Sequence, residues 1–137
     1  MGGNFLFYLG AFALVLGALI IVHELGHYFV ARLCGVKVLR FSVGFGRPLL
    51  LGRYGRDGTE WAIAAFPLGG YVKMLDEREG PVEPQELARA FNRQSVWKRI
   101  LVVAAGPLAN LLLAILIYGL LFMQGIEELR PILAAPP

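Results

Sequence analysis

The sequence has 137 residues, of which 57% are hydrophobic, and its formal net charge is +3. That apolar share is above the roughly 45–50% of ordinary soluble domains. The positive charge does not indicate a nucleic-acid partner. Twelve of the thirteen basic residues lie between Arg32 and Arg99, beside two uncharged apolar runs, and they form no stripe among stacking aromatic residues.

The first apolar run, Phe5–Val22, contains no charged residue and continues directly into the motif His23-Glu24-Leu25-Gly26-His27. Its length suits a membrane-spanning helix, which needs about 20 apolar residues. A secretory signal peptide would begin with a basic segment, and no basic residue precedes this run. We expect the helix itself to extend from about Phe5 to Leu33, and we assign residues 1–35 to the first transmembrane segment.

His23 and His27 are four residues apart, so they share one face of the expected helix. Two neutral imidazoles at this spacing can bind one Zn²⁺, and Glu24 is then placed as the general base for a metal-activated water. Ionisable groups at membrane depth are costly and mark function. His23 lies about 27 Å along the helix from Phe5. The motif therefore predicts a metal-dependent hydrolase whose site lies in the cytoplasmic part of the bilayer.

Residues 36–75 have the character of a small β unit. Apolar and polar residues alternate over Leu39–Phe45 and again over Glu60–Phe66, which is the period of strands with one apolar face. The Asp57-Gly58 pair between them is a hairpin-turn signal. Because backbone polar groups cannot face lipid directly, we expect this membrane-associated unit to be shielded by protein or to line a wet cavity.

The remaining residues divide into a cytoplasmic loop, 76–94, whose first part is acidic, a second transmembrane helix, 95–125, and the start of a periplasmic segment, 126–137. Ser95 is the expected N-cap of the second helix. Between Ile100 and Met123 of that helix, Asn110 is the only strongly polar side chain, and we interpret it as a residue for helix packing or loop tethering.

Charge distribution predicts the orientation of the two helices. Lysine and arginine are enriched in loops on the cytoplasmic side of membranes. We therefore expect loop 32–99 to be cytoplasmic and both chain ends to lie on the periplasmic side. The predicted fold class is a mainly α membrane protein, with two transmembrane helices around a β-hairpin on the cytoplasmic side.

Four segments together resemble the bacterial site-2 protease family, in particular its regulator-of-sigma-E type, over essentially the whole chain. They are His23–His27, Arg40–Gly46, Pro67–Met74 and Ala105–Asn110. The resemblance implies a zinc intramembrane endopeptidase of the bacterial inner membrane. Its substrates would be transmembrane segments of anti-sigma factors and remnant signal peptides.

The resemblance also implies a role for the β unit. In the family this region is a re-entrant loop that takes up extended substrate by strand addition, in which main-chain groups pair with an open edge. The matching substrate-binding residues here are Gly69, Gly70, Tyr71, Val72, Lys73 and Met74.

The third zinc ligand is not evident. The family supplies it as an aspartate in a Leu-Asp-Gly motif on a later helix, after periplasmic PDZ domains, and nothing in these 137 residues matches that motif. We therefore expect an N-terminal portion that by itself binds zinc weakly and has little activity. The alternative is an inactive fragment or a metal-binding membrane adaptor, although an adaptor has no need of Glu24. A zinc transporter would require polar residues on several helices.

Overall fold

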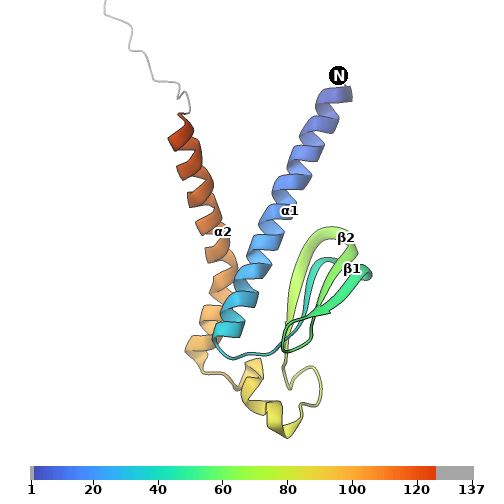
Figure 1. Ribbon diagram of the computed structural model, residues 1–137, viewed down its shortest axis with the longest axis vertical. Coiled ribbons are helices and arrows are strands. Elements are labelled where there is room, and N and C mark those ends of the chain that lie inside the picture. The colour runs from blue at the N-terminus through green and yellow to red at the C-terminus, as the bar shows by residue number, and fades with distance from the viewer. Residues whose placement is uncertain (1, 126–137) are drawn as a thin grey trace, which may run out of the picture.

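A computed structural model describes residues 2–125, and the expected segment 126–137 lies outside the described residues. The elements in chain order are helix α1 (Gly2–Leu33), strands β1 (Val38–Tyr54) and β2 (Thr59–Met74), the 3₁₀ helices η1 (Pro84–Arg89) and η2 (Phe91–Arg93), and helix α2 (Val96–Gln124). Figure 1 shows α1 between α2 and the hairpin, with the 3₁₀ helices below.

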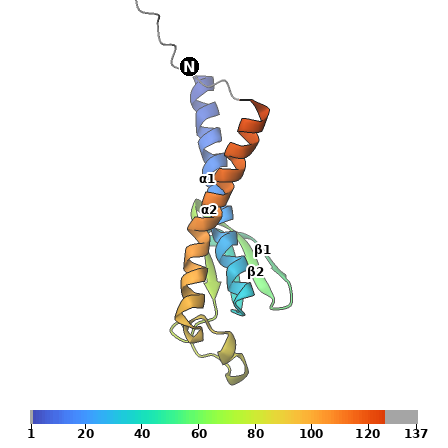
Figure 2. The same cartoon turned by 90° about the vertical axis from the view of Figure 1, so that its left-hand side faces the viewer.

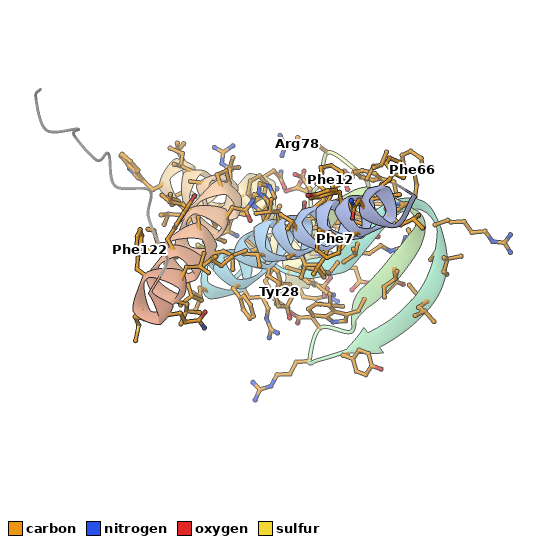
Figure 3. All side chains as sticks on the ribbon, turned by 90° about the horizontal axis from the view of Figure 1, so that it is seen from above. Phe7, Phe12, Tyr28, Phe66, Arg78 and Phe122 are labelled. Atoms are coloured by element: carbon orange, nitrogen blue, oxygen red, sulfur yellow. The ribbon has the colours of Figure 1, made fainter. Side chains whose placement is uncertain are left out.

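The two helices are long and apolar enough to cross a membrane. They contain 32 and 29 residues, and at 1.5 Å per residue each exceeds the hydrocarbon thickness of about 30 Å. α1 begins at Gly2, earlier than the predicted Phe5. Phe7, Phe12 and Phe122, labelled in Figure 3, are 70%, 64% and 59% exposed. The predicted elements are confirmed, since two long apolar helices flank an antiparallel hairpin in the chain.

The helices cross rather than run parallel, as the turned view in Figure 2 shows, and they are closest in their lower halves. The predicted N-cap of α2 is confirmed, because the Ser95 hydroxyl accepts a hydrogen bond from the backbone N–H of Lys98. The helix ends at Gln124 and is capped by Gly125, whose φ of 76° lies in the left-handed region that glycine adopts without strain.

The hairpin is more folded than the alternation predicts, because both long strands double back. Residues 40–43 of β1 pair with 70–73 of β2 on one side and with 60–63 on the other. The outer part of β1, residues 48–54, then pairs with 59–64. The strand segments therefore lie in the order 70–74, 38–43, 59–64 and 48–54. The predicted turn at Asp57-Gly58 is confirmed.

The prediction of one apolar face holds only for part of β1. Phe41 is buried, but Phe45 is 42% exposed and Ser42 is 1% exposed. The Ser42 hydroxyl is satisfied by donating to the backbone carbonyl of Gly44 at 2.9 Å. Gly44 has a φ of 92°, and a Cβ there would lie 2.9 Å from the backbone oxygen of Ala64. The strand bends at this glycine, which changes the face that the following residues present.

The core joins the lower half of α1 to the hairpin and to the start of α2. Tyr28 lies 4.9 Å from Trp61 and 6.1 Å from Phe41, measured between ring centroids and in edge-to-face geometry. The other buried members of this cluster are Ala31, Val36, Val38 and Val102. This packing fixes the hairpin against α1 just below the histidine motif.

Polar contacts hold the turn end of the hairpin to η1. Arg89 donates to both carboxylate oxygens of Asp57, at 2.8 and 2.6 Å, and Lys37 donates to Glu86 at 2.6 Å. The hydrogen bonds from Arg89 hold the pKa of Asp57 below its usual value. The backbone also contributes, because the N–H of Lys37 donates to the carbonyl of Arg89.

Candidate metal centre

The two histidines of the motif direct one nitrogen each at a common point. Nε2 of His23 and Nε2 of His27 are 3.1 Å apart, and the rings are nearly perpendicular, at 83°. Two imidazoles bound to one tetrahedral Zn²⁺ at 2.0–2.1 Å would place their nitrogens about 3.3 Å apart. The arrangement in the structure therefore fits the first two ligands of a zinc ion with little movement.

The backbone of α2 holds one of these rings in place. Nδ1 of His27 lies 2.7 Å from the carbonyl oxygen of Val102. Since a carbonyl only accepts, Nδ1 carries the proton and Nε2 presents a lone pair. Zinc-binding histidines commonly have this second contact, which fixes both the tautomer and the ring orientation.

Glycines allow α2 to approach the motif this closely. A Cβ on Gly106 would lie 2.8 Å from Cε1 of His23 and 2.6 Å from Cε1 of His27. A Cβ on Gly26 would lie 2.7 Å from Cβ of Ala109. Small residues at helix contacts permit such approach in membranes. The sequence signal for this close approach was a glycine within a Leu-rich helix.

Glu24 is buried, at 9% exposure, and faces the hairpin. A Cβ on Gly70 would lie 3.3 Å from Cγ of Glu24 and 2.7 Å from the carbonyl oxygen of Ser42. A cavity of about 290 Å³ opens between these elements. Its lining residues are Leu19, Ile20, His23, Glu24, Phe45, Gly69, Gly70 and Asn110.

The predicted substrate-binding residues lie in three different environments. Gly69 and Gly70 line the cavity beside Glu24. Tyr71 and Lys73 line a different, polar cavity of about 480 Å³ on the hairpin. Val72 and Met74 pack against the buried core cluster. Alternation along a strand explains this division, because successive side chains point to opposite faces.

Asn110 contacts the motif, which its interpretation as a packing or tethering residue did not anticipate. Its Nδ2 lies 3.5 Å from Nδ1 of His23. Its Oδ1 is buried and has no hydrogen-bond partner within residues 2–125. Asn110 comes one helical turn after Gly106, so both residues face the histidines.

A third metal ligand is not found within residues 2–125, where no three His, Cys, Asp or Glu side chains cluster. Several acidic residues of the hairpin and its following loop are engaged elsewhere. Glu60 accepts from Arg40 at 2.7 and 2.9 Å, and these hydrogen bonds lower the pKa of Glu60. Asp76 is similarly paired with Arg78.

Comparison with known proteins gives consistent results. Residues 11–135 match the model of peptidase family M50. The chain is 58% identical over 135 residues to a protein of Ralstonia nicotianae named "Putative zinc metalloprotease", covering 93% of this chain and 29% of the relative. It is 52% identical over 130 residues to the regulator of sigma-E protease of Salmonella typhimurium, covering 95% of this chain and 29% of that protein. The chain thus spans less than a third of the length of these curated relatives.

Proposed function

The chain belongs to peptidase family M50, and we propose that it forms the metal-binding part of a zinc-dependent intramembrane endopeptidase. The observation that carries this proposal is the convergence of the two Nε2 atoms, 3.1 Å apart, beside the buried carboxylate of Glu24. Soluble helices use the same residue spacing to bind zinc and to activate water.

The roles follow from the residue types. His23 and His27 would hold the metal, and a zinc ion bound there supplies Lewis-acid polarisation of a peptide carbonyl and acidifies a water molecule. Glu24 takes the proton from the attacking water and delivers it to the leaving amine. Its burial keeps the carboxylate beside the cavity and away from bulk water. Since residues 2–125 offer two ligands, we expect these residues alone to bind zinc weakly.

For the substrate we propose an extended peptide paired along residues 69–74. Gly69 and Gly70 support this placement, because they line the cavity beside Glu24 and have no side chain to obstruct a second backbone. The named relative is a regulator of sigma-E protease. Transmembrane segments of anti-sigma factors and remnant signal peptides are accordingly the proposed substrates.

For the location we propose the bacterial inner membrane, with α1 and α2 in the bilayer. Segments 1–35 and 95–125 would span it, segment 36–75 would enter it from the cytoplasmic side to reach Glu24, and segment 76–94 would lie at its cytoplasmic face. The exposed apolar side chains on both helices support burial in lipid. The basic residues of loop 32–99 support its cytoplasmic placement.

The proposal is tested by separating metal binding from proton transfer. In lipid nanodiscs, His23→Ala and His27→Ala should each weaken zinc binding at least tenfold, whereas Glu24→Gln should leave it within about threefold. In cells, Glu24→Gln should abolish cleavage of a transmembrane-segment reporter. Cleavage that survives Glu24→Gln would contradict the proposed role of this residue. If the protein's function persists without cleavage, the alternative hypothesis of a metal-binding adaptor is correct.

A further inference from the structure

The hydrogen bonds of the candidate metal centre determine where its protons lie. Nδ1 of His27 must donate to the carbonyl of Val102, so in neutral His27 the Nε2 atom is an acceptor. The 3.1 Å contact between the two Nε2 atoms then requires the proton on Nε2 of His23. Nδ1 of His23 is consequently an acceptor, and it faces the amide nitrogen of Asn110.

This proton arrangement is incompatible with metal binding through Nε2 of His23. A nitrogen that ligates a metal must present a lone pair, so the imidazole proton has to lie on Nδ1 instead. Nδ1–H then needs an acceptor, because a buried donor without a partner costs about 1–3 kcal/mol. The amide nitrogen of Asn110 has no acceptor lone pair to offer.

The oxygen of the same Asn110 amide can supply the missing acceptor. Oδ1 of Asn110 is buried and has no partner within the described residues. A half-turn of the terminal amide exchanges Oδ1 with Nδ2 and places a carbonyl oxygen beside Nδ1 of His23. One orientation of the Asn110 amide thus donates to an unprotonated Nδ1 of His23, and the other accepts from a protonated Nδ1.

We propose that Asn110 is a positioning residue for the metal site, which accepts a hydrogen bond from Nδ1–H of His23 when Nε2 binds zinc. The inference rests on the proposed function, since it assumes that His23 is a ligand. Asn110 does for His23 what the carbonyl of Val102 does for His27. Because an amide can donate as well as accept, Asn110 also allows the other tautomer of His23, in which Nε2 carries the proton and donates it to Nε2 of His27.

The test compares two substitutions of similar size in the protein reconstituted in lipid nanodiscs. Asn110→Asp keeps an acceptor beside Nδ1, whereas Asn110→Leu removes it. The readout is the dissociation constant for Zn²⁺ from chelator competition, with the visible spectrum of bound Co²⁺ as a second measure of ligand geometry. Asn4→Leu, which makes the same change at an exposed position of α1, is the matched control.

We expect Asn110→Leu to weaken zinc binding by about 10–100-fold, the range found for contacts behind a metal ligand. Asn110→Asp should bind as tightly as the unsubstituted protein or more tightly, and Asn4→Leu should have no effect. Equal affinities for all variants would overturn the inference, as would an Asp variant weaker than the Leu variant, because a packing residue tolerates Leu better than a buried charge. If the unsubstituted protein shows no binding that His23→Ala removes, the proposed function itself fails and the inference fails with it.

Discussion

The lower and upper halves of the helix pair differ in what their side chains contact. In the lower half, Gly26 and Gly106 bring the helices together, and the side chain of Tyr28 is buried against the hairpin. In the upper half the helices diverge (Figure 1), and Phe7 and Phe122 are exposed. The same apolar composition thus gives a specific packing in one half and a surface for lipid or further helices in the other. The difference lies in which small and polar residues meet a partner and not in hydrophobicity, since the glycines of the upper half have no atom of the described residues within 4 Å of an added Cβ.

The largest effect should come from removing an aromatic ring from the packed half. Phe41 is 4% exposed in the core cluster, so Phe41→Ala should destabilise the hairpin by about 3–5 kcal/mol. Phe12→Ala, at a side chain 64% exposed, is the control in the upper half and should change stability much less. Thermal unfolding in nanodiscs, followed by near-ultraviolet circular dichroism, would measure both. Equal losses would mean that the two halves are not packed differently.

A smaller effect, but one directed at the metal centre, should come from Gly106→Ala. The added methyl group would contact both histidine rings, one of which is held by Val102, so their nitrogens must separate. We expect zinc affinity to fall at least tenfold. Gly119→Ala is the control on the same helix, because among the described residues nothing lies within 4 Å of the added Cβ. It should bind zinc normally and stabilise the helix by up to about 1 kcal/mol.

The smallest effect should come from the ion pair at the turn end of the hairpin. The pKa of Asp57 is lowered by Arg89, so this contribution to stability is complete above the ordinary aspartate pKa of about 4. It is lost as pH falls through the lower, folded-state pKa. Asp57→Asn should cost less than about 1 kcal/mol at pH 7, since the pair is partly solvated. The protection factors of the turn amides, from which the intrinsic pH dependence of hydrogen exchange has been divided out, should then become insensitive to acid in this variant. A pH response that remained after the substitution would assign it to another group.

Local signals in the sequence predicted much of this structure. The uncharged runs predicted the two long helices, Ser95 predicted where the second helix starts, and Asp57-Gly58 predicted the turn. The spacing of His23 and His27 predicted two nitrogens on one helix face, and the structure places them together. All of these depend on residues near one another in the chain, where geometry follows directly from dihedral preferences and periodicity.

Features that depend on distant residues were not predictable in the same way. β1 changes its pairing partners on either side of Gly44, and this consequence of the glycine appears only in the strand pairing. The approach of Gly106 and Asn110 to the histidines depends on how two helices cross, and residues 87 positions apart meet there. Periodicity identifies the face of a helix but not its partner.

The two ends of the hairpin are held in place by different kinds of contact. Contacts of Asp57 and Lys37 with the 3₁₀ region fix it at one end, while Leu49, Phe66 and Leu68 at the other end are 65%, 56% and 63% exposed. The strand segments between these ends contain five to seven residues, which makes the hairpin roughly 20 Å long. The end of the hairpin that carries Gly69 beside the cavity is therefore the end farthest from these ion pairs. It is positioned by close packing against α1 and not by charge.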